Sequence, residues 1–164
     1  MALAYLRTTT SKNAYFSRIK AADKKKFREQ LALLDMGLED RMKQPVGLLS
    51  GGQRQAITLL MASIQKPKLL LLDEHTAALD PKTAAKVLEI SDQIISENHL
   101  TAMMVTHNMK DAIAHGNRLI MMHEGKVILN IAGEDKKKLT VGDLLHQFEK
   151  VSGEEFASDK ALLS

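Results

Sequence analysis

The apolar positions of the chain recur with a helical period in its first part. In residues 22–36 this spacing predicts a helix, and Gly37 follows as a stop signal. A second helix is predicted from about Gly51 to Gln65, and Pro67 marks its end. The sides that we expect to be buried carry Phe27, Leu31 and Leu34 in the first helix, and Ala56, Leu59, Leu60 and Ser63 in the second.

Three short runs of uninterrupted apolar residues predict strands, at 69–72, 102–105 and 119–122. Such runs, bounded by breakers, are typical of strands buried on both faces of a sheet. Predicted helices separate the runs, from Pro81 to about Asn98 and over about 108–115. The order strand, helix, strand, helix, strand predicts an α/β fold with a parallel sheet and crossover helices.

The last part of the pattern predicts a hairpin and a final helix. Glu124-Gly125 separates the third apolar run from Val127–Leu129, as a hairpin turn does. From Thr140 onward we expect a helix and a tail.

Polar residues follow the first two predicted strands at their carboxyl ends. Asp73-Glu74 ends one run and Thr106-His107 ends the next, so we expect both pairs at the same rim, where ligands bind in such sheets. Two adjacent acids point in different directions, so one could reach Mg²⁺ while the other polarises a water. The alternative is that these acids only begin a loop or cap a helix. His107 after a strand is more often structural than catalytic, since the six histidines show no metal-binding spacing.

Two helix starts carry polar residues with two compatible interpretations. Ser50 and Gln53 have the spacing of a capping box, and Asp80 before Pro81 is a good N-cap. A helix start also exposes N–H groups and the positive end of the helix dipole, and Gly51 and Gly52 would let an anion approach closely.

Composition narrows the class of protein. The 164 residues suffice for one domain with a sizeable core, and they contain no cysteine for disulfides or thiolate metal sites. The sequence contains no run of 18 apolar residues, so it predicts no membrane span. The net charge of +3 comes from mixed basic and acidic runs, and there is no tryptophan, so we expect no nucleic-acid partner.

The order of the motifs resembles the ATP-binding cassette (ABC) ATPase family. "LSGGQ" is similar to its signature motif, "LLLLDE" to Walker B, "ALD" to the D-loop and "TH" to the switch histidine, over about residues 22–131. The resemblance implies part of a P-loop NTPase (RecA-like) fold. In this fold the end of the helical subdomain would cover about residues 1–52. The later half of a mainly parallel sheet core would follow over about residues 53–131, and a C-terminal helix and tail over residues 132–164.

The resemblance also implies roles for individual residues. Asp73 would help to hold Mg²⁺, Glu74 would orient or deprotonate the attacking water, and His107 would contact the γ-phosphate of ATP. Asp80 would communicate across a head-to-tail homodimer. The residues that would touch the ATP of the partner subunit are Ser50, Gly51, Gly52 and Gln53. His75 and Ala77 stand where the family commonly has Pro and Ser, from which we expect modest effects on D-loop packing.

The Walker A motif of the family, G-x-x-x-x-G-K-[ST], does not occur in the sequence. The pair Gly47 and Gly52 has the spacing of its glycines but is followed by Gln53-Arg54. The family places Walker A and a Q-loop before the signature, and "MALAYL" resembles the first helix of the helical subdomain. We therefore expect an N-terminally truncated product, a product with a misassigned start site, or a fragment, inactive alone, rather than an organellar protein with a transit peptide.

The function implied for the complete subunit is ATP hydrolysis that energises an ABC transporter. The partners would be a transmembrane permease and a substrate-binding protein, the transport would be import of a small solute, and the location the cytoplasmic face of the membrane. The tail resembles a branch found with amino-acid-like substrate-binding proteins. The alternatives are a non-transport ABC protein of translation or DNA maintenance and a non-catalytic remnant.

Overall fold

The computed structural model describes residues 21–162, so the helix expected near Met1 lies outside the described residues. The chain divides into two compact units, with the boundary between Val105 and Thr106. No helix in the described part is both long enough and apolar enough to cross a membrane.

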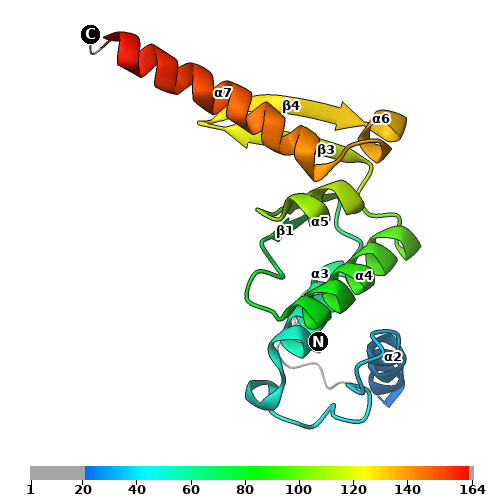
Figure 1. The fold of residues 1–164 in the computed structure, drawn as a ribbon. Helices are drawn as coiled ribbons and strands as arrows, with labels where there is room; N and C mark the ends of the chain where they lie inside the picture. The colour runs from blue at the N-terminus through cyan, green and yellow to red at the C-terminus, as the bar shows by residue number, and fades with distance from the viewer. Residues whose placement is uncertain (1–20, 163–164) are drawn as a thin grey trace, which may run out of the picture. The chain divides into compact units, whose positions relative to one another are not determined.

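The first unit is built from helices and one parallel pair of strands (Figure 1). Its elements in chain order are α2 (Ala21–Ala32), the 3₁₀ helix η2 (Val46–Leu48), α3 (Gly51–Ser63), β1 (Leu70–Asp73), α4 (Pro81–Glu97) and β2 (Ala102–Val105). Local signals explain the bounds of α4. Asp80 caps its start, Pro81 fits the first helical position, and Asn98 closes its end.

The first helix is shorter than predicted. Helix α2 ends at Ala32, whereas the apolar spacing predicted a helix over residues 22–36. Left-handed backbone at Asp35 and Gly37 breaks the helical path beyond that point. Leu34 is still 1% exposed, because the turn after α2 folds it into the core.

The predicted buried side of α3 is confirmed and forms the centre of the core. Ala56, Leu59, Leu60 and Ser63 are all buried. The apolar cluster around them joins α3 to α4 and β1 through Leu70, Leu72, Ile90 and Ile94, and to the segment around α2 through Leu31, Leu34 and Leu38.

Strands β1 and β2 lie parallel, with Leu70 opposite Ala102 and Asp73 opposite Val105. The parallel pairing and its crossover helix α4 are as predicted. The expected burial on both faces was wrong. Leu70 and Leu72 face the core cluster, but Leu71 is 65% exposed, because within the described residues the cluster covers one face only. The opposite face exposes Leu69, Leu71, Met103 and Val105.

The second unit is a hairpin with three helices (Figure 1). Its elements are α5 (Met109–Ala114), β3 (Arg118–His123), β4 (Lys126–Ala132), α6 (Gly133–Lys137) and α7 (Val141–Leu162). Both residues of the turn, Glu124 and Gly125, have positive φ, which matches the right-handed twist of a two-residue hairpin. Helix α7 packs on the hairpin, where the rings of Phe148 and His123 meet edge to face at 5.0 Å.

The third predicted strand does not extend the parallel pair. In the described part of the chain, β3 pairs antiparallel with β4 in a separate sheet, with a bulge between Met121 and Met122. The tight turn explains why β3 pairs with β4, because it delivers β4 directly beside β3 at little loop-closure cost.

A buried lysine ties α6 to α5. Lys136 is 3% exposed, and its Nζ donates to the carbonyl oxygens of Ile113 and His115, the second at 2.9 Å. These carbonyls close the C-terminal end of α5, where a cation is favoured by the helix dipole. Helix α6 was not predicted from the sequence.

Candidate functional site

The start of α3 contains the predicted capping box. Gln53 N donates to Ser50 Oγ at 3.2 Å, and Ser50 N donates to Gln53 Oε1 at 3.1 Å. The side-chain Nε2 of Gln53 donates to the Met36 carbonyl at 3.2 Å, which ties α3 to the segment after α2. Ser50 itself is exposed, so its hydroxyl serves the helix and still faces outward.

Gly51 and Gly52 are the first two residues of α3, so their N–H groups have no acceptor within the helix. They also bring α3 close to α4. A Cβ on Gly52 would lie 2.2 Å from Thr83 Cγ2, and one on Gly51 would lie 3.0 Å from Leu79 Cδ2. Sequence reasoning missed this packing role, because Thr83 is far along the chain and carries no local signal for it.

Asp73 and Glu74 lie exposed where the parallel pair ends. Asp73 is the last residue of β1, and Glu74 N donates to the Val105 carbonyl at 2.9 Å. Glu74 is left-handed, with φ of 42°, and its carbonyl accepts from Ala77 N at 3.0 Å. For a residue with a Cβ this conformation costs about 1–2 kcal/mol, and such strain is common at functional sites. Turns elsewhere give the same conformation to Asp35, Lys66, His99 and Glu124.

The two carboxylates fit a magnesium ion that is shared with a ligand. Mg²⁺ is commonly bound through one or two carboxylates together with substrate phosphates and water. In residues 21–162 no group of three or more His, Asp or Glu residues is placed to hold a metal by itself. The pair Asp73-Glu74 therefore supplies hard oxygen ligands of the right chemistry without forming a closed protein cage.

His75 ties the segment after β1 to α4. Its Nε2 lies 3.1 Å from the Oγ of Ser91, a buried residue that donates to the Val87 carbonyl at 2.8 Å. Sequence reasoning expected only modest packing effects from His75 and did not find this partner. No sequence signal marks it, since a serine inside an amphipathic helix is ordinary.

Asp80 acts as the N-cap of α4, as one of its two interpretations predicted. Thr83 N donates to Asp80 Oδ1 at 3.1 Å. Hydrogen bonds from the side chain and then the backbone of Thr83 hold the pKa of Asp80 below its ordinary value. Since Gly52 and Asp80 both contact Thr83, the signature segment and the "ALD" segment lie together in the first unit.

His107 belongs to the second unit, between the end of β2 and α5, and it is exposed. The residue after it shapes the loop. Asn108 N donates to Thr106 Oγ1 at 3.1 Å, and Asn108 Oδ1 caps α5 by accepting from Lys110 N at 3.0 Å. The chain around His107 is thus held by hydrogen bonds on both sides.

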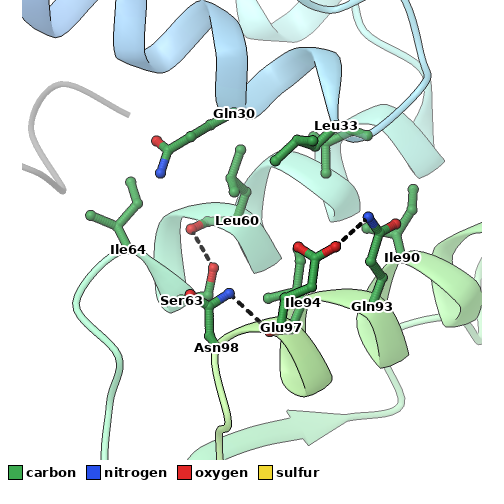
Figure 2. A pocket seen from close by; sticks show the side chains of 11 residues that line it. Gln30, Leu33, Leu60, Ser63, Ile64, Ile90, Gln93, Ile94, Glu97 and Asn98 are labelled. Carbon is green, nitrogen blue, oxygen red and sulfur yellow. Dashed lines mark hydrogen bonds between the residues drawn. The ribbon is translucent and has the colours of Figure 1, made fainter.

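A pocket of about 240 Å³ lies between α2, α3 and α4 (Figure 2). None of the predicted site residues lines it. Four of its polar side chains already make bonds along the helices. Gln93 Nε2 donates to Glu97 Oε1 at 2.9 Å, and Asn98 Nδ2 donates to the Ile94 carbonyl at 2.9 Å. The fourth is Ser63, whose Oγ donates to the Leu60 carbonyl at 2.9 Å. The predicted site is therefore the exposed rim and the helix starts, and not this pocket.

Comparisons with known proteins identify relatives of this arrangement. A family model described as "ABC transporter" matches residues 4–77. The tyrosine transport ATP-binding protein of Clostridioides difficile is 49% identical over 116 residues, which are 71% of this chain and 46% of that protein. An aliphatic sulfonates import ATP-binding protein of Agrobacterium fabrum is 38% identical over 104 residues, 63% of this chain and 40% of that protein. The chain thus spans less than half the length of these relatives.

Solved structures share the fold. A transporter described as being of the metal-chelate ABC type, in an inward-facing conformation, aligns with a TM-score of 0.67 and 30% identity over 90% of this chain and 57% of that one. The ADP conformation of an ATP-binding cassette aligns with a TM-score of 0.68 over 90% of this chain and 59% of the other, at 20% identity. The predicted cassette fold is confirmed, and the chain belongs to the family of ABC transporter ATP-binding proteins.

Proposed function

We propose that this chain is part of an ATP-binding subunit that hydrolyses ATP to ADP and phosphate and thereby energises an ABC importer of a small solute. The observation that carries the proposal is the order and placement of its motifs. Ser50-Gly51-Gly52 starts a helix, and Asp73-Glu74 ends a parallel strand. A nucleotide site needs donors for phosphate at the first place and carboxylates for metal and water at the second.

In this proposal the carboxylates divide the work at the rim. Asp73 contributes an oxygen to Mg²⁺, which when bound neutralises charge on the phosphate oxygens. Glu74 orients the attacking water or accepts its proton. His107 donates a hydrogen bond to the γ-phosphate of ATP.

The start of α3 would serve the nucleotide of a second subunit. We propose a head-to-tail homodimer in which Ser50, Gly51, Gly52 and Gln53 face the ATP held by the partner, and in which Asp80 links the two sites. The exposed hydroxyl of Ser50 and the free N–H groups at the helix start support this role.

The proposed partners are a transmembrane permease and a substrate-binding protein. The relatives support an importer, because they are named for tyrosine transport and for aliphatic sulfonates import. We place the complete subunit at the cytoplasmic face of the membrane, bound through the permease. We expect no nucleic-acid partner.

The test uses a complete subunit that contains this chain. We define the fused subunit as the N-terminal part of the C. difficile tyrosine transport relative joined to these 164 residues at the homologous position. It should hydrolyse ATP with Mg²⁺, whereas the 164 residues alone, which lack a Walker A sequence, should not.

Replacing Glu74 by Gln in the fused subunit should lower turnover about 10²- to 10⁴-fold and leave ATP binding intact. Phosphate release and equilibrium binding of a fluorescent ATP analogue measure the two effects. Near-normal turnover in the Glu74→Gln variant would contradict the proposed role of this carboxylate.

A further inference from the structure

The His75 side chain attaches the segment that carries Glu74 to α4. The family motif does not account for this contact. His75 occupies a position where the related motif commonly has proline, and its Nε2 lies 3.1 Å from Ser91 Oγ. Ser91 is 3% exposed and lies in the middle of α4. A buried partner in a regular helix is a rigid anchor for the residue that binds it.

The direction of this hydrogen bond follows from the number of hydrogens available. The single hydroxyl hydrogen of Ser91 is used by the Val87 carbonyl, at 2.8 Å, which can only accept. Ser91 Oγ must therefore accept from His75, so that His75 carries its hydrogen on Nε2. Proline has no group that could make this bond.

Glu74 lies between two anchors. On its N-terminal side, its own N–H donates to the Val105 carbonyl and continues the pairing of β1 with β2. On its C-terminal side, the next residue is held by Ser91. Between these anchors the backbone of Glu74 is left-handed, a conformation that a free chain would leave for a right-handed or extended one.

We propose that His75 is a positioning residue that keeps Glu74 in its left-handed conformation by donating from Nε2 to Ser91. The inference rests on the proposed function, in which the Glu74 carboxylate acts on the attacking water. Removing the anchor leaves the peptide between Glu74 and His75 restrained by the bond from Ala77 N to the Glu74 carbonyl but no longer by Ser91, so the peptide moves more freely and the carboxylate is displaced from the water that it must reach. Because ATP is held mainly by other residues, the loss should appear in kcat rather than in KM.

The first arm of the test measures the anchor in the 164-residue chain. Nitrogen-15 NMR of the histidine ring should show His75 as the Nε2–H tautomer, with a ring N–H that exchanges slowly. Ser91→Ala should remove this protection and shift the amide signals of Glu74 and His75. An Nδ1–H tautomer, or amide signals unchanged by Ser91→Ala, would refute the anchor.

The second arm measures turnover in the fused subunit. His75→Ala and Ser91→Ala should each lower kcat about 10- to 100-fold with little change in KM for ATP, as a small misplacement of a catalytic group does. The double variant should be no worse than either single one, because both remove the same bond. His75→Gln, which keeps an N–H donor at similar reach, should restore most of the kcat.

The control is Ser96→Ala, an exposed serine on the same helix, which should leave kcat unchanged. Thermal melts of all variants separate loss of fold from loss of position. Normal turnover in Ser91→Ala, while Glu74→Gln abolishes turnover, would sink the inference and leave the proposed function standing. If Glu74→Gln left the ATP turnover of the fused subunit unchanged, the proposed function would be overturned. The NMR measurements would still show whether the hydrogen bond between His75 and Ser91 exists.

Discussion

The Ser50 hydroxyl could cap α3 and also contact the ATP of a partner subunit. A negative charge introduced at this position can distinguish the two roles. As a cap it accepts from Gln53 N at 3.2 Å, a role that Asp and Asn fill equally well. If the hydroxyl also faces the phosphates of a partner's ATP, a carboxylate at this position would repel them. We expect Ser50→Asp in the fused subunit to keep the monomer's melting temperature and to lose ATP-driven dimerisation and turnover.

The matched control for this change is Ser50→Asn, which preserves the cap without adding charge. Size-exclusion chromatography with and without ATP reports dimerisation, and thermal melts report the fold. A Ser50→Asp protein that still dimerises with ATP would leave Ser50 as a cap and nothing more.

The lowered pKa of Asp80 predicts how the stability of the fold changes at acidic pH. Because hydrogen bonds from Thr83 lower its pKa in the folded state, the unfolded chain binds the proton more tightly than the folded one. The stabilisation by the carboxylate is therefore complete above its ordinary pKa of 3.8 and is lost as the pH falls through the lower folded value. Asn is also a good cap, so Asp80→Asn removes the charge alone.

We expect the stability difference between the wild type and Asp80→Asn to be constant at neutral pH and to shrink below about pH 4. Urea unfolding at a series of pH values measures it. A difference that grows as the pH is lowered would have the wrong sign for a carboxylate stabilised in its charged form.

At the scale of elements, the contact between α3 and α4 depends on the absence of a side chain at Gly52. A Cβ there would overlap the methyl group of Thr83, whose branched side chain has few alternative rotamers. We expect Gly52→Ala to destabilise the 164-residue chain by about 1–3 kcal/mol in urea unfolding, the usual cost of overpacking.

The same contact supplies its own rescue. Thr83→Ser removes the clashing methyl and keeps the hydroxyl that hydrogen-bonds Asp80, so Gly52→Ala with Thr83→Ser should recover most of the loss. Gly47→Ala is the control, since no atom lies within 4 Å of its added Cβ. A Gly52→Ala protein as stable as the wild type would mean that the helices separate freely.

The elements that the sequence predicted well are those with local signals. The cap at Asp80, the Glu124-Gly125 turn and the spacing on α3 depend on residues a few positions apart, and each is as expected. The exposed face of β1 was not predictable, since a run of leucines looks the same whether one face or both are covered. The contacts of Gly52 with Thr83 and of His75 with Ser91 join distant positions, and no spacing rule reports such pairs.

At the scale of the whole molecule, the chain divides into two compact units, from which we expect stability to be a local property. In the second unit, Lys136 satisfies carbonyls at the end of α5, and losing it leaves part-buried acceptors without that donor. We expect Lys136→Met to destabilise α5 and α6 by about 1–3 kcal/mol. Hydrogen exchange read by mass spectrometry should show faster exchange in residues 106–140 and unchanged exchange in α3 and α4.

The control for this variant is the neighbouring Lys137→Met. Lys137 is exposed, and its ion pair with Glu134 at 2.6 Å is of the surface kind that contributes little. Its exchange pattern should match the wild type. Faster exchange spread evenly over both units in Lys136→Met would show that the units unfold together.

The close approach of Gly52 to Thr83 also bears on how mutational scans of related cassettes are interpreted. Alanine at the signature glycine would score as a loss of fitness whether or not the glycine ever meets a nucleotide, because crowding against α4 is enough to lower the amount of folded protein. The two causes separate only when position 83 is varied in the same library. With serine at position 83, alanine at position 52 should no longer lower the amount of folded protein. Any loss of transport activity that remains in such variants is then due to the contact of Gly52 with the nucleotide.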